Sequence, residues 1–146
     1  MRSNAQAKRS QVCCALYCLW ARGLLNAQSL DVAWQHAVNT LRAYYGESSD
    51  YSAELEFYIR PDDKPIGQGS GYVVDSMRSA RMVLQRETSY ETVIKAAIAL
   101  GHDTDTTACI AGGIAGIYYG LDAIPISWMQ ALRGKEMVEP LINQLL

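Results

Sequence analysis

Apolar residues recur at the spacing of an α-helix along almost the whole chain. Ser29 is a candidate N-cap and Gly46 a candidate helix end, and between them Ala33, Ala37 and Leu41 share one side. Similar patterns predict helices at 7–26, 29–46, 51–61, 72–87, 89–101, 109–120, 126–134 and 135–146. No segment shows the alternation of a strand, and no internal repeat is present. The sequence therefore predicts an all-α fold, a compact helical bundle.

Length and charge restrict the classes of function. The 146 residues match one domain, predicted over 1–146. The net charge is −2, and Lys and Arg are scattered, so we expect no nucleic-acid partner. No apolar run approaches the roughly 18–20 residues that span a bilayer, and the N-terminus is polar. We expect a soluble, cytoplasmic protein with no membrane partner.

Four cysteines lie at positions 13, 14, 18 and 109, and none of them forms a CxxC pair. A zinc site would need a second pair or histidines at ligand spacing, and both histidines of the chain are isolated. The pattern therefore predicts buried, reduced thiols that belong to the core.

Two acidic residues stand where a helix is predicted to begin. Asp103 and Asp105 alternate with threonines, and Thr106 follows them. A helix N-terminus favours an Asp or Thr cap, which accounts for one of these residues. Two carboxylates and a hydroxyl in one place also match the hard oxygen ligands of Mg²⁺. Both interpretations are compatible with the spacing.

Glycines recur every fourth residue along the following helix, at Gly112, Gly116 and Gly120. Each costs about 1 kcal/mol relative to Ala in a helix, so something is expected to approach this face closely. The approaching group is either another helix or a ligand.

The segments GSGYVVDSMRSA (69–80) and GHDTDTTACIAGGIAGIYYGLDAIPISW (101–128) resemble the C-terminal half of the ADP-ribosylglycohydrolase family, which includes the dinitrogenase reductase activating glycohydrolases. The likeness covers several separated motifs in the right order. It implies an all-α bundle that binds two magnesium ions and cleaves ADP-ribose from modified proteins or nucleotides. The fold implied for this chain is a partial ADP-ribosylglycohydrolase-like bundle.

The resemblance also implies site residues. Asp103, Asp105 and Thr106 match the family's C-terminal metal ligands. The loop 67–72 matches the segment that approaches ADP-ribose, and its substrate-binding residues here are Gly69, Ser70, Gly71 and Tyr72. Glycine amides next to a helix N-terminus suit a phosphate group, although an ordinary helix-entry loop would have the same composition.

The chain departs from the family pattern in two ways. His102 replaces the second glycine of the usual pair. The N-terminal acidic residue and the Asp-Asp-Thr cluster of the family are also missing, and we interpret Asp62 and Asp63 as solvent-exposed. We therefore expect the C-terminal part of a magnesium-dependent hydrolase of N- or O-glycosidic bonds to ADP-ribose. An N-terminal-half chain or a homo-oligomer would complete it, and its substrate would be an ADP-ribosylated protein or an ADP-ribose-containing small molecule. The alternative is a non-catalytic remnant or interaction module that folds by self-association.

Overall fold

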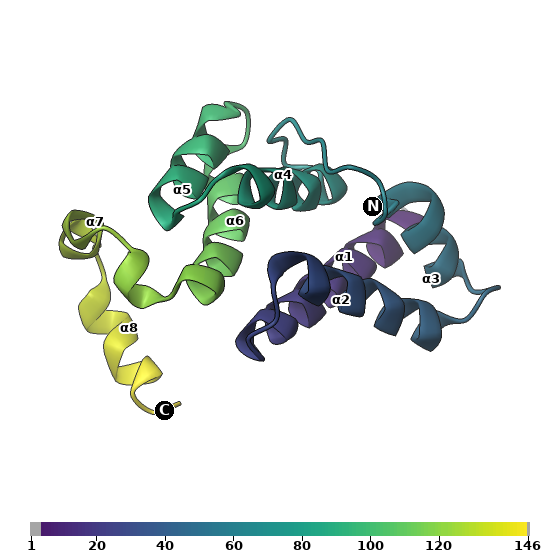
Figure 1. Cartoon of the computed structure of the whole chain (residues 1–146), viewed down its shortest axis with the longest axis horizontal. Helices are drawn as coiled ribbons and strands as arrows, with labels where there is room; N and C mark the ends of the chain where they lie inside the picture. The colour runs from purple at the N-terminus through teal and green to yellow at the C-terminus, as the bar shows by residue number, and fades with distance from the viewer. Residues whose placement is uncertain (1–3, 146) are drawn as a thin grey trace.

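The computed structural model describes residues 4–145, and within them it contains helices and no strand (Figure 1). The elements are α1 (Asn4–Leu25), α2 (Leu30–Tyr45), α3 (Asp50–Ala53), the π-helix η1 (Glu54–Ile59), α4 (Val73–Arg86), α5 (Tyr90–Ala99), α6 (Thr104–Tyr119), the 3₁₀ turn η2 (Leu121–Ala123), α7 (Ile126–Ala131) and α8 (Lys135–Ile142). The predicted all-α fold class is confirmed. Residues 1–3 and 146 of the predicted domain lie outside the described part.

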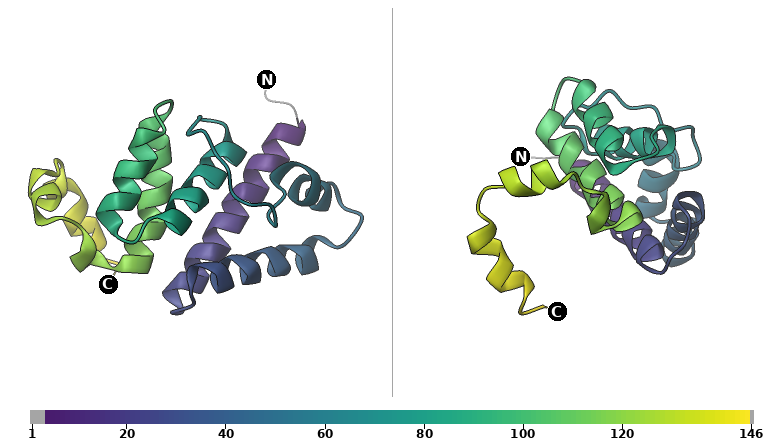
Figure 2. Two further views of the ribbon diagram at one scale, coloured as in Figure 1. Left: turned by 45° about the horizontal axis from the view of Figure 1, so that its top comes forward. Right: turned by 60° about the vertical axis from the view of Figure 1, so that its left-hand side comes forward.

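The helices form a bundle from which the C-terminal segment projects. Helix α2 packs on α1, while α4, α5 and α6 pack on one another beside them (Figure 1). Helices α7 and α8 arch away from the rest of the molecule, and neither of these two described helices carries a buried residue (Figure 2). None of the described helices is both long and apolar enough to cross a membrane.

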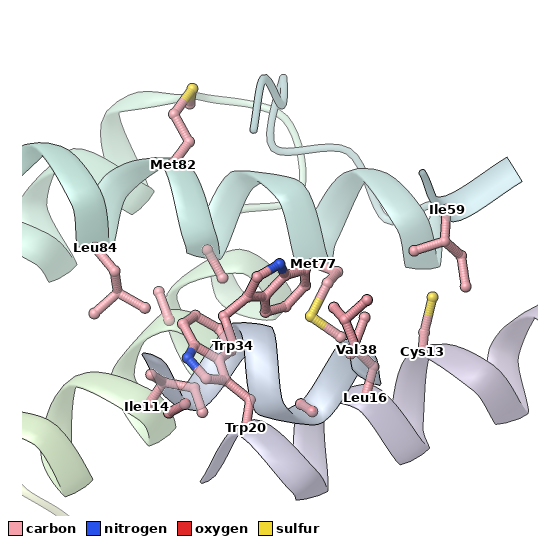
Figure 3. Close-up of a cluster of buried hydrophobic side chains, with 14 of the residues drawn as sticks. Cys13, Leu16, Trp20, Trp34, Val38, Ile59, Met77, Met82, Leu84 and Ile114 are labelled. Carbon is pink, nitrogen blue, oxygen red and sulfur yellow. The ribbon is translucent and has the colours of Figure 1, made fainter. Parts of the chain in front are cut away.

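Two tryptophans lie at the centre of the core. Trp20 of α1 and Trp34 of α2 meet edge to face with ring centroids 5.2 Å apart, and Leu16, Met77 and Ile114 surround them (Figure 3). Burying a large apolar side chain contributes about 1.5–3 kcal/mol. Both indole N–H groups donate to backbone carbonyls, at 3.1 and 3.0 Å, so the buried rings leave no polar atom unpaired. This cluster ties α1 and α2 to α4 and α6.

Helix starts follow the predicted caps. The Ser29 hydroxyl accepts a hydrogen bond from the amide of Val32, and α2 begins at Leu30. Ser89 forms a capping box with Thr92 at the start of α5. These two short-range signals place both helix starts correctly because the capping bonds join residues only three positions apart.

The segment predicted as one helix at 51–61 differs from that expectation. It divides into α3 and the π-helix η1, and Arg60, the residue that follows η1, lies in the left-handed region with φ 50°. The amide of Arg60 donates to the carbonyl of Leu55 at 2.8 Å. The wider turn brings Glu54, Leu55 and Ile59 into the interior together. Apolar periodicity alone could not reveal this change of helix type.

The prediction that the cysteines are core residues is wrong for three of the four. Cys13 is buried, which raises the pKa of its thiol to about 12, whereas Cys14, Cys18 and Cys109 are exposed. The buried side of α1 follows the phase of Leu16 and Trp20, which turns positions 14 and 18 outward. All four cysteines line one apolar groove of about 350 Å³ together with residues of α1, α4 and α6.

The glycine pattern of α6 reflects helix packing. A Cβ atom at Gly112 would lie 3.0 Å from Cδ1 of Ile94, and one at Gly116 would lie 3.9 Å from Cε2 of Tyr90. Both neighbours belong to α5, so a second helix approaches this face. Gly120 does not continue the stripe, because it follows the helix with φ 84° and caps its end.

Gly112→Leu is expected to lower stability by about 1–3 kcal/mol, because its side chain would collide with Ile94 of α5, which already lies 3.0 Å from the position of a Cβ atom. Gly116→Ala is the matched control and is expected to keep or raise the melting temperature, since its Cβ makes an ordinary contact and Ala favours the helix. Thermal unfolding followed by circular dichroism compares the two. Equal melting temperatures for the wild type and Gly112→Leu would show that this contact is loose.

Candidate ADP-ribose and metal site

The loop that precedes α4 is held by one carboxylate. Oδ1 of Asp75 accepts the amide of Gln68 at 2.9 Å, and Oδ2 accepts both the amide and the hydroxyl of Ser70, at 2.7 and 2.8 Å. Asp75 lies in the first turn of α4, where the helix dipole favours an anion. Hydrogen bonds within the protein therefore hold the loop in its conformation.

Two glycines let this loop pass close to α4. Gly69 has φ 75°, a conformation that residues with a side chain rarely adopt, and its amide donates to Oγ of Ser79 at 2.9 Å. A Cβ atom at Gly67 would lie only 2.5 Å from the backbone nitrogen of Ser79. The backbone of the loop therefore rests directly on the helix.

The loop also contacts the acidic turn at the start of α6. The amide of Asp103 donates to the carbonyl of Gly69 at 2.8 Å. A Cβ atom at Gly71 would collide with Oδ2 of Asp103. The structure thus brings together the two segments that the sequence singled out, the loop 67–72 and the turn around Asp103.

Asp103 occupies the N-cap position of α6, but its side chain makes no capping hydrogen bond. The Thr106 hydroxyl, and next the side chain of Asp105, hold the pKa of the Asp103 carboxyl below its usual value. Asp105 is exposed, and the buried hydroxyl of Thr107 in the same turn has no hydrogen-bond partner. The Asp103 side chain therefore lies beside Thr106 in the first turn of α6, where both the capping and the metal interpretation stay open.

Comparison with known proteins shows the family of the chain. The model of the ADP-ribosylglycohydrolase family matches residues 3–146. The chain belongs to the ADP-ribosylglycohydrolase family. No solved structure matches it.

Three curated relatives of this ADP-ribosylglycohydrolase chain illustrate the extent of the similarity. ADP-ribosylhydrolase ARH3 of Homo sapiens is 46% identical over 67 residues, which are 46% of this chain and 17% of the human protein. ADP-ribosylarginine hydrolase Tri1 of Serratia proteamaculans (strain 568) is 30% identical over 124 residues, 84% of this chain and 32% of that protein. ADP-ribosyl-[dinitrogen reductase] glycohydrolase of Rhodospirillum rubrum is 35% identical over 66 residues, 45% and 22% of the two chains. The matched residues thus make up less than a third of each relative.

The donor atoms of the acidic turn suit Mg²⁺ but are few. Asp103, Asp105 and Thr106 offer two carboxylates and a hydroxyl, which are hard oxygen ligands. Among the residues that the structure describes, no group of three or more His, Cys, Asp or Glu side chains is arranged to hold a metal ion. The acidic turn therefore offers three hard oxygen donors, fewer than the six ligands that Mg²⁺ prefers.

The structure changes one detail predicted for the loop. The amides of Gly69 and Ser70, expected to face a phosphate group, donate instead to Ser79 and Asp75. Sequence reasoning passed over Asp75, although an acidic residue in the first turn of a helix was a readable signal. The interpretation of Asp62 and Asp63 as exposed residues is confirmed, and both form surface ion pairs with arginines.

Gly71→Ala is expected to weaken Mg²⁺ binding at least about tenfold, because the new methyl group would displace the Asp103 carboxylate. The melting temperature without metal should change little, since the three nearest atoms all belong to the short side chain of Asp103, which can rotate. Titration calorimetry with Mg²⁺ measures the first effect and thermal unfolding the second. Unchanged Mg²⁺ affinity would show that the position of this carboxylate does not matter for the metal.

Proposed function

We propose that this chain forms the C-terminal side of a magnesium-dependent ADP-ribosylglycohydrolase. When the site is complete, the enzyme hydrolyses the N- or O-glycosidic bond that joins ADP-ribose to a protein or small molecule. The observation that supports this most directly is the contact between the loop 67–72 and the acidic turn, through the bond between Asp103 and Gly69. All three relatives described above are named for the hydrolysis of ADP-ribosyl groups.

The residues of the two segments would have different roles. Asp103, Asp105 and Thr106 would hold Mg²⁺, which when bound supplies the polarisation of a water or of ribose hydroxyls. The loop residues Gly71 and Tyr72 would approach the ADP-ribose. Because Asp75 already fixes the loop, little conformational freedom would be lost on binding.

The site needs further ligands from outside the described residues. Two carboxylates and one hydroxyl do not fill the six positions that each Mg²⁺ prefers. Water, a chain that carries the N-terminal part of the family fold, or a second copy of this chain would supply the remainder. We propose a cytoplasmic location for the enzyme.

The test is a binding and turnover experiment with the purified chain. ADP-ribose is titrated into the protein by calorimetry with and without Mg²⁺, and release of ADP-ribose from an ADP-ribosylated protein is followed in parallel. We expect Mg²⁺-dependent binding and little or no turnover by the chain alone. Absence of ADP-ribose binding in the presence of millimolar Mg²⁺ would refute the proposal.

A second candidate function is that of a non-catalytic module that self-associates. Exposed apolar side chains crowd the projecting C-terminal segment, namely Ile126, Leu132, Met137, Val138, Leu141, Ile142 and Leu145. Surfaces of this kind mark association sites in soluble proteins, and a two-fold dimer is the commonest arrangement of identical chains. We expect light scattering to give the mass of a dimer, and Met137→Glu with Leu141→Glu to shift it towards that of the monomer. A monomeric wild type would contradict this candidate.

A further inference from the structure

One arginine of α1 reaches the loop that precedes α4. Nη1 of Arg9 donates to the hydroxyl of Tyr72 at 2.7 Å, and Nε donates to Oε2 of Glu54 at 2.6 Å. These bonds join α1, which contains Arg9, to η1 and to the end of the loop. Glu54 and Tyr72 lie 45 and 63 residues from Arg9 along the chain. The loop is therefore tied to the bundle at its tyrosine as well as at Asp75.

The guanidinium group of Arg9 is confined by its surroundings. Its carbon lies 3.9 Å from the centroid of the Tyr58 ring, a cation–π contact. The side chain of Glu54 is only 7% exposed, and the hydrogen bond to it raises the pKa of Arg9. A planar fork with two fixed bonds and a stacked face keeps one orientation, which a lysine could not reproduce. Arg9 is therefore a rigid anchor with its charge already paired.

Tyr72 is held at both ends. Its carbonyl accepts the amide of Ser76 in the first turn of α4, at 2.8 Å, and its hydroxyl is held by Arg9. The residue is nevertheless 42% exposed. The exposed ring of Tyr72, the residue that follows Gly71, is thus kept in one orientation without any ligand.

We propose that Arg9 is a positioning residue of the ADP-ribose site and acts through Tyr72. This inference rests on the proposed function, because it assigns a role towards the same ligand. Arg9 itself does not contact the ligand, since its bonds are made to Glu54 and Tyr72. It holds the Tyr72 ring where the ring packs against bound ADP-ribose, so that this side chain does not have to be ordered on binding.

A double-mutant cycle tests this coupling. ADP-ribose is titrated by calorimetry into the wild type, Tyr72→Phe, Arg9→Lys and the double variant, at saturating Mg²⁺. Tyr72→Phe and Arg9→Lys are each expected to weaken binding about tenfold, which corresponds to ~1.4 kcal/mol, and the double variant no further than either. Lys8→Gln is the matched control and should bind like the wild type, because Lys8 pairs with Asp50 at the surface. Additive losses would show that Arg9 acts on the ligand directly and would overturn the proposal.

A second measurement detects the anchor without any ligand. In protein with ¹³C-labelled tyrosine, the Cζ signal of Tyr72, assigned from its absence in Tyr72→Phe, should move in Arg9→Lys and stay in Lys8→Gln. An unmoved signal in Arg9→Lys would mean that the bond is not made, which also overturns the proposal. If the wild type and Arg9→Lys bind ADP-ribose equally tightly, the positioning role is refuted and the proposed function is not. Wild-type protein that binds no ADP-ribose refutes the proposed function, and the positioning role with it.

Discussion

Asp105→Ala is expected to abolish the Mg²⁺-dependent rise in melting temperature, and Asp103→Ala should do the same. A ligand that binds only the folded state stabilises it by about 2.7 kcal/mol at one hundred times its dissociation constant. For a chain of this length, each kcal/mol corresponds to roughly 2–4 °C. The wild type should therefore gain about 5–10 °C at saturating Mg²⁺, and the variants should gain nothing. Thermal unfolding across a Mg²⁺ series measures the difference.

Asp122→Ala provides the control for this experiment, because Asp122 is an exposed acidic residue outside the acidic turn. It should retain the full metal-dependent shift. A lower melting temperature of Asp103→Ala without metal, together with an absent Mg²⁺ response in the wild type, would favour the capping interpretation of this residue. A normal Mg²⁺ response in both variants would remove Asp103 and Asp105 from the metal site.

Gly67→Ala is expected to cause the largest loss of stability, more than about 2 kcal/mol. Its methyl group would lie 2.5 Å from the backbone nitrogen of Ser79 and 2.7 Å from its Cα atom, and a helix backbone cannot yield as a side-chain end can. The loop would have to leave α4 and would lose the bond between the Gly69 amide and the Ser79 hydroxyl. Urea unfolding gives the free energy, and ADP-ribose titration reports the consequence for binding.

Ser79→Ala separates the two causes in Gly67→Ala. Ser79→Ala removes the Ser79 hydroxyl, and with it the same hydrogen bond, but adds no atom beside the helix, so it should cost only about 1 kcal/mol. If Gly67→Ala proves no more harmful than Ser79→Ala, the loop can shift without strain, and the close contact with α4 is not required.

Local signals in the sequence predicted the features that depend on neighbouring residues. The caps at Ser29 and Ser89 lie three positions from their partners. Gly112 indicated that another group approaches this face of its helix closely. The acidic turn and the loop 67–72 were found from their motifs. Their contact in space was implied only by family resemblance, because 34 positions separate Gly69 from Asp103.

Other features depend on distant partners or on helix phase and left no local signal. Arg9 and Tyr72 are 63 residues apart, and nothing in either neighbourhood indicates their bond. Glu54 is buried in the π-helix η1, a short segment whose apolar residues Leu55 and Ile59 have a spacing that also fits an α-helix. Cys13 and Cys14 are adjacent and equally apolar, yet only the phase of α1 decides that one is buried and the other exposed.

The hydrogen bond from the Asp103 amide to the Gly69 carbonyl spans the helical hairpin formed by α4 and α5. This amide can exchange its proton with solvent only when the loop and the turn separate. Its exchange rate is therefore a direct measure of how often the two halves of the candidate site come apart. A ligand that bridges the loop and the turn will slow that exchange, whereas one that binds either segment alone will leave it unchanged.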